Sequence, residues 1–112
     1  RLQLAGFSGR GFTWDVGRIK PELAAPGVEI TSCAPGGGYT SRTGTSMAAP
    51  FVTGSCAALM QWGIILGNDP YLYGEKLKAY LINGARRLDS IDYYPNEEIG
   101  WGTICLRNSV PR

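Results

Sequence analysis

The sequence predicts an α/β chain in which a long apolar helix packs against a sheet. The first observation is the run over residues 47–66, which is apolar on nearly every side, as in a helix buried in a core. The second is the alternation of apolar and polar residues over 28–32, which indicates a half-buried strand. The third is an amphipathic pattern after Asp69, which predicts a second helix.

Composition sets the limits for these elements. A chain of 112 residues is expected to form one compact domain, and 44% hydrophobic against 18% charged residues excludes disorder. Eleven basic and nine acidic residues leave no positive surface typical of nucleic-acid binding. The chain contains no histidine, so chemistry that needs an imidazole base or ligand cannot be completed by this chain alone. It begins at Arg1 without methionine or signal-type segment, and we expect an internal piece of something longer.

Short elements precede the apolar run. We expect, in order, a strand-like segment at 2–7, a glycine-rich turn at 8–11, a polar excursion at 13–18, a stop at Pro26-Gly27, the strand at 28–32 and a glycine loop at 36–38. Within the apolar run, Thr53, Ser55 and Gln61 and the absence of flanking charges argue against a membrane span. We therefore expect a buried helix whose small residues allow neighbouring backbone to come close, and no membrane partner.

The second helix has recognisable ends. Asp69 is the expected N-cap, Pro70 the first helical residue and Gly84 the C-terminal stop. Its apolar stripe is expected to consist of Tyr73, Leu77, Tyr80 and Leu81. Its solvent face is expected to consist of Glu75, Lys76 and Lys78. A polar loop at 91–99 and a short strand at 103–106 follow. The cysteines Cys33, Cys56 and Cys105 are odd in number and widely spaced. We therefore expect free thiols, at least one of them buried.

The segment 44–50, GTSMAAP, is the part of the sequence that indicates chemistry. It delivers Ser46 at the start of the apolar helix, where unpaired backbone N–H groups and the positive end of the helix dipole converge. Such donors stabilise an oxyanion that forms when a serine attacks a carbonyl. Pro50 is expected within the first turn, where a missing N–H costs little. The alternative is that Ser46 is only an N-cap, since serine is a common cap.

The same segment, with Val52 and Gly54 after it, resembles the nucleophile signature of subtilisin-like serine proteases. Residues 7–11 (FSGRG) resemble the F-S-x-x-G turn of this family, and 20–28 (KPELAAPGV) resemble its K-P-(D/E)-x-x-A-P-G-V segment. Residues 100–102 (GWG) resemble the G-x-G before its last strand. The resemblance extends from Phe7 to Ile104. The sequence at residues 11–13 and 18–21 is similar to that of clostridial subtilases.

The resemblance implies a role for each residue of the motif. Ser46 is the nucleophile, and its own backbone N–H donates a hydrogen bond to the oxyanion. The Thr45 hydroxyl supports the same oxyanion more weakly. Met47 lines the leaving-group side, with ordinary packing as the alternative, and Gly44 and Thr43 flank the substrate backbone. Two positions depart from the family pattern: Phe51 stands where histidine is usual, and Cys105 where Asn or Asp is usual.

The family also places a catalytic Asp, a catalytic His and an oxyanion Asn before the serine, and this chain has none of them. Its aspartates Asp15, Asp69, Asp89 and Asp92 match no such motif. The resemblance thus implies that residues 1–112 are the C-terminal segment of a subtilase catalytic domain, a three-layer sandwich with a mostly parallel sheet and a central buried helix that starts at the nucleophile. Because a serine without its base is a poor nucleophile, we expect the chain alone to be inactive.

Partners follow from the same resemblance: the N-terminal part of the same protease, a peptide or protein substrate and a pro-segment. We expect no metal site in this segment. Family members often bind calcium, which leaves calcium open for the intact enzyme, but this segment does not support it, because the adjacent Glu97 and Glu98 point their side chains apart. The alternative function is a pseudoprotease, a subtilase fold kept as a binding or signalling module after loss of catalytic residues.

Overall fold

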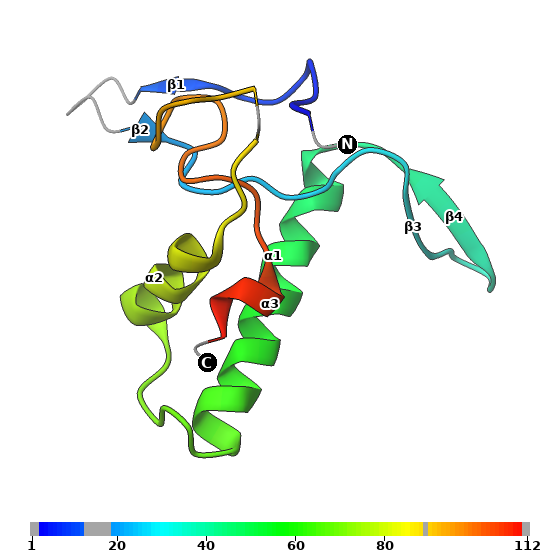
Figure 1. The fold of residues 1–112 in the computed structure, drawn as a ribbon. Coiled ribbons are helices and arrows are strands. Elements are labelled where there is room, and N and C mark those ends of the chain that lie inside the picture. The colour runs from blue at the N-terminus through cyan, green and yellow to red at the C-terminus, as the bar shows by residue number, and fades with distance from the viewer. Residues whose placement is uncertain (1–2, 13–18, 89, 111–112) are drawn as a thin grey trace.

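A computed structural model describes residues 3–12, 19–88 and 90–110 (Figure 1). The polar excursion expected at 13–18 lies outside these residues. In chain order the elements are β1 (Gly11–Phe12), β2 (Ile19–Lys20), β3 (Ile30–Cys33), β4 (Tyr39–Arg42), α1 (Thr45–Met60), the π-helical turn η1 (Gln61–Ile65), α2 (Gly74–Gly84) and α3 (Leu106–Ser109).

The strands pair as two antiparallel ribbons. β1 pairs with β2, and β3 pairs with β4 in a hairpin that places Ile30 opposite Arg42 and Cys33 opposite Tyr39. The mostly parallel sheet is not formed within the described residues, where the parallel pairing is an isolated bridge between Ala24 and Thr103. A parallel sheet needs neighbouring strands joined by long crossovers, and these four strands have antiparallel neighbours instead. The hairpin projects away from the helices, and its β3 strand is mostly exposed rather than half-buried (Figure 1).

Helix α1 and η1 form one continuous helical segment of 21 residues, the longest element of the fold. The helix itself was predicted, but the prediction that it is buried is wrong for these residues: only 11% of its most apolar 18-residue stretch is buried. Among the described residues, this segment is a helix long and apolar enough to cross a membrane, with a mean hydropathy of 1.3. Core helices of globular domains share this property. The remaining described elements cover too little of α1 to bury it.

The chain is also less compact than one independent domain. Its radius of gyration is 15.3 Å, whereas a compact chain of this length has about 13 Å. The excess reflects the projecting hairpin and the uncovered side of α1 (Figure 1). By itself the chain is therefore more extended than one compact domain of this length.

A small core lies where the C-terminal half of α1, the following turn and α2 meet. Leu59, Leu72, Leu77 and Leu81 are buried together, and the side chains packed around them include Trp62 and Tyr80. Gly63 allows the turn to approach, because a Cβ at this position would lie 2.8 Å from Leu72 Cδ2 and 2.9 Å from the Asp69 carbonyl oxygen. The prediction that Leu77 and Leu81 face the core is confirmed, whereas Tyr73 is 56% exposed and lies outside it.

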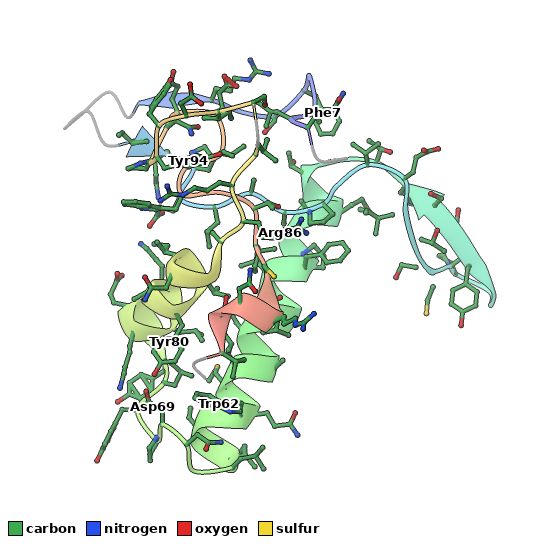
Figure 2. All side chains as sticks on the ribbon, in the orientation of Figure 1. Phe7, Trp62, Asp69, Tyr80, Arg86 and Tyr94 are labelled. Carbon is green, nitrogen blue, oxygen red and sulfur yellow. The ribbon has the colours of Figure 1, made fainter. Side chains whose placement is uncertain are left out.

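Helix α2 begins four residues later than predicted. Its N-cap is Tyr73, and Asp69 instead binds the turn before the helix. Asp69 Oδ1 accepts hydrogen bonds from the Tyr71 N–H (3.3 Å) and Lys76 Nζ (2.9 Å), and its Oδ2 accepts one from the Tyr80 hydroxyl (2.7 Å). In Figure 2, Trp62, Asp69 and Tyr80 lie close together at the end of α1. A carboxylate with partners on α2 ties the turn to that helix, so it does not act as a cap.

Three smaller predictions differ from the structure. Residues 3–7 contain no strand and instead form a turn in which the Ser8 N–H donates to the Ala5 carbonyl. The strand expected at 103–106 is reduced to bridges at Thr103, because the chain turns into α3 at Leu106. The cysteines are free, but Cys33 is exposed and the other two are only half-buried.

Candidate active site

Ser46 is the second residue of α1, and its side chain is exposed at the N-terminal end of the helix. The N-cap is Gly44, and no side chain caps this helix by a hydrogen bond. The interpretation of Ser46 as a mere N-cap is therefore wrong. The Ser46 hydroxyl does not cap the helix, which is the most common role of a serine at the start of a helix.

Backbone donors are available beside that hydroxyl. The Met47 N–H donates to the Gly44 carbonyl at 3.0 Å, whereas the N–H groups of Thr45 and Ser46 precede the first i to i−4 bond of the helix. The first turn of α1 contains no acidic residue that would neutralise the positive end of its dipole. The site is thus suited to a developing negative charge next to Ser46.

Pro50 modifies the helix immediately behind the serine. It is the sixth residue of α1 and so lies in the second turn, not in the first turn as predicted. A proline there has no N–H to donate to the carbonyl of Ser46, four residues earlier. The Ser46 carbonyl therefore lacks the i+4 N–H partner that a regular helix provides.

The residues expected around Ser46 lie in one continuous stretch from the hairpin to the helix. Strand β4 ends at Arg42, the Thr43 and Gly44 turn follows, and Thr45 begins α1. Thr45 and Thr43 are exposed, and Met47 is half-buried. The structure brings all of the predicted residues to one end of α1.

Two residues from another segment join this turn, and they were not predicted. The Gly44 N–H donates to the Gly27 carbonyl (2.8 Å), and the Glu29 N–H donates to Thr43 Oγ1 (2.8 Å). The sequence signal for this loop was the Pro26-Gly27 turn, which marks a change of chain direction but does not name its partner. Only the tertiary structure joins residues so far apart in the sequence.

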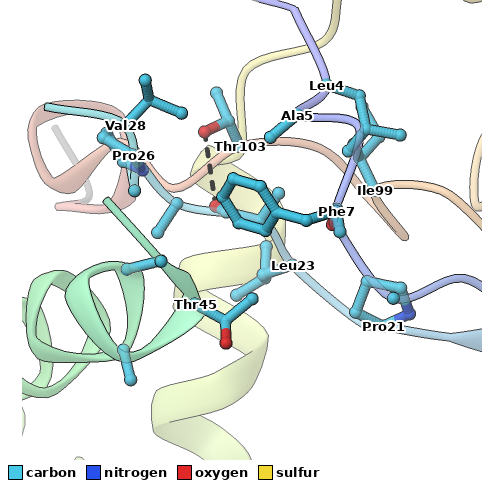
Figure 3. A pocket seen from close by; sticks show the side chains of 18 of the residues that line it. Leu4, Ala5, Phe7, Pro21, Leu23, Pro26, Val28, Thr45, Ile99 and Thr103 are labelled. Carbon is cyan, nitrogen blue, oxygen red and sulfur yellow. Dashed lines mark hydrogen bonds between the residues drawn. The ribbon is translucent and has the colours of Figure 1, made fainter.

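An apolar hollow of about 860 Å³ lies beside the N-terminal half of α1 (Figure 3). Its lining includes Phe7, Leu23, Val28 and Ile99 together with Thr45. On α1 the hollow is lined by Thr45, Ala48, Ala49 and Val52, the same side of the helix from which Leu59 packs into the core. Its walls come from the segments that resemble the family motifs around residues 7–11 and 20–28.

The titratable groups with shifted pKa values lie away from Ser46. Hydrogen bonds from Lys76 and then Tyr80 lower the pKa of Asp69, and the same carboxylate raises the pKa of both partners. Hydrogen bonds from Lys20 and Lys78 lower the pKa of Glu22. Burial raises the pKa of Cys56, which lies about 15 Å along α1 from Ser46.

No side chain in the described part of the chain is placed to act as the general base for Ser46. Its second-turn neighbour Phe51, where the family pattern has histidine, is 41% exposed and apolar. Among residues 3–12, 19–88 and 90–110, no group of three or more His, Cys, Asp or Glu side chains could hold a metal ion. The described residues thus present an exposed serine hydroxyl beside unpaired backbone N–H groups at the start of α1.

The fold and this site define the class of protein. The sequence profile of the Subtilase family matches residues 1–102, and the chain therefore belongs to the subtilase family of serine proteases. The solved structure of the Clostridium perfringens CspB protease is 50% identical, with a TM-score of 0.88 over 95% of this chain and 22% of that chain. The expected similarity to clostridial subtilases is thus confirmed.

Two curated relatives from Bacillus subtilis cover 96% of this chain. The minor extracellular protease Vpr is 36% identical and the serine protease AprX 34% identical. The chain spans only 14% of Vpr and 25% of AprX. Most of each relative therefore lies beyond the part that this chain matches.

Proposed function

We propose that this chain supplies the nucleophile of a subtilisin-like serine endopeptidase. The observation that carries the proposal is the exposed Ser46 hydroxyl at the N-terminal end of α1, which no capping bond occupies. Ser46 Oγ attacks the carbonyl carbon of a peptide bond, and its proton passes to a histidine outside these 112 residues. The peptide amine leaves, and water then releases the acyl group from Ser46.

The neighbours of Ser46 take the roles that the family resemblance gives them. The Ser46 N–H donates to the oxyanion, and the Thr45 hydroxyl supports it. Thr43 and Gly44 flank the substrate backbone, and Met47 lines the leaving-group side. The exposure of Thr43 and Thr45 and the unneutralised positive end of α1 are consistent with these roles.

The base, its aspartate and the oxyanion asparagine belong, in this proposal, to the N-terminal part of the same protease. Support comes from the absence of histidine and from the apolar side of α1 that nothing in the described residues covers. The same part would complete the three-layer domain by packing against this uncovered side of α1. The isolated chain is then inactive, since loss of the triad base alone costs about 10⁶ in turnover in subtilisin, a value taken from that enzyme itself.

The test uses the full-length protease and a fluorophosphonate probe, which modifies activated serines. Labelling and peptide hydrolysis are expected in the wild type and absent in Ser46→Ala. The matched control is Ser32→Ala, an exposed serine on β3 whose loss should leave both signals unchanged. A folded wild-type preparation that is neither labelled nor able to hydrolyse peptides would overturn the proposal and favour the pseudoprotease.

A further inference from the structure

We infer that Thr43 is a positioning residue whose side-chain hydroxyl locks the Ser46 turn to the loop of residues 26–29. The inference rests on the proposed role of Ser46 and adds to it. The family resemblance places Thr43 beside the substrate backbone and gives its hydroxyl no role. The structure gives the hydroxyl a separate contact, with the Glu29 N–H at 2.8 Å.

The need for such a contact follows from how the turn is placed. It joins a projecting hairpin to an exposed helix end, and α1 has its buried residue, Leu59, near its other end. Packing among the described residues therefore does little to fix the backbone around Ser46. Catalysis by a serine depends on holding its oxygen within a few tenths of an ångström of the productive position.

Two parallel hydrogen bonds supply the missing restraint. Adjacent residues of the turn, Thr43 and Gly44, bind loop residues that are two apart, Glu29 and Gly27. One bond uses a backbone donor of the turn and the other a side-chain acceptor. Together they prevent the turn from rotating about either contact, which a single bond would allow.

The loop is shaped at some cost to make these contacts. Glu29 has a φ of 51°, a left-handed conformation that a residue with a side chain adopts only when its surroundings require it. Gly27 lies so close to the turn that a Cβ there would be 2.8 Å from the Gly44 carbonyl oxygen and 3.2 Å from Ala48 Cβ. Strain and close approach at the same loop indicate that its geometry is fixed by the turn it supports.

The experiment compares Thr43→Val with Thr43→Ser in the full-length protease. Valine keeps the branched shape but leaves the Glu29 N–H without its acceptor, whereas serine keeps the hydroxyl. We expect Thr43→Val to lower kcat about three- to tenfold, the effect of one net hydrogen bond. KM should change little, because binding of the substrate backbone does not use the hydroxyl. Thr43→Ser should restore kcat.

The control is Thr31→Val, the same change at an exposed position of β3, which should leave kcat unchanged. Active enzyme is counted by fluorophosphonate labelling, and melting temperatures show whether each variant is folded. If Thr43→Val does not fold, Gly27→Ala tests the same lock from the loop side and should also lower kcat more than KM changes.

Wild-type kcat in Thr43→Val, or an equal loss in Thr43→Ser, would overturn the inference. A loss confined to KM would show that the hydroxyl serves substrate binding, and would overturn it as well. Activity that survives in Ser46→Ala would instead refute the proposed function. The two failures are therefore distinguishable in one set of variants.

Discussion

The two ends of α1 are held by different forces. At its C-terminal end, buried leucines and the three partners of Asp69 join α1, η1 and α2 into the core of the chain. At its N-terminal end, where Ser46 is exposed, two hydrogen bonds to the loop of residues 26–29 hold the backbone. The buried core and the proposed nucleophile therefore lie at opposite ends of one helix.

The largest effect on stability is expected at the packed end. Leu59→Ala removes a fully buried side chain and should lower the free energy of unfolding of the full-length protease by about 3 kcal/mol. Leu66→Ala, at a 65% exposed position beyond η1, is the control, with an expected change within about 0.5 kcal/mol. Denaturant unfolding measures both. Equal effects would contradict the placement of the core.

A second substitution tests the close contact between η1 and the following turn. Gly63→Ala places a methyl group 2.8 Å from Leu72 Cδ2 and 2.9 Å from the Asp69 carbonyl oxygen. The displaced neighbours should cost about 1–3 kcal/mol, again measured by denaturant unfolding. A change within about 0.5 kcal/mol would show that this end of α1 is more loosely packed than the structure indicates.

Gly54→Ala tests whether the open side of α1 is covered in the full-length protease. Among the described residues, nothing outside the helix's own nearby backbone lies within 4 Å of a Cβ at Gly54, so the helix itself would gain about 0.5–1 kcal/mol from alanine. If the N-terminal part of the protease packs closely on α1, as proposed, that gain should be absent or reversed. A full gain in thermal or denaturant unfolding would contradict close packing at Gly54.

Asp69→Asn tests the polar contacts of the packed end through their pH dependence. The pKa of Asp69 is lowered in the folded protein, so its charged form contributes stability above the ordinary carboxyl pKa, and this contribution is lost as pH falls through the lowered value. The stability difference between the wild type and Asp69→Asn should therefore be largest at neutral pH and shrink below pH 3.8. A difference that is constant with pH would contradict the ionic role of Asp69.

Sequence patterns predicted elements well where local forces decide them. The apolar run became α1 and η1, and Leu77 and Leu81 face the core, because helix periodicity depends on residues close in the sequence. Asp69 was predicted as an N-cap because caps are local, but its partners on α2 include Tyr80, eleven residues away. The burial of α1 was overestimated because an apolar surface says that cover is needed and does not say which segment provides it.

For the candidate site, the motif predicted that Ser46 starts the helix, and the structure places it at the second position. The loop contacts of Thr43 and Gly44 could not be predicted, since a hydroxyl and an N–H do not identify their partners along the chain. Pro50 was placed one turn too early, because it follows Ser46 by four residues and so lies in the second turn of a helix that starts at either Thr45 or Ser46.

The sequence by itself determined the family, the identity of the proposed nucleophile and the lack of histidine, because these depend only on which residues are present and in what order. Tertiary structure decided which groups meet: Glu29 with Thr43, Gly27 with Gly44, and Asp69 with Tyr80. It also decided how much of α1 is covered. Such contacts depend on the path of the whole chain, so no local pattern of residues encodes them separately.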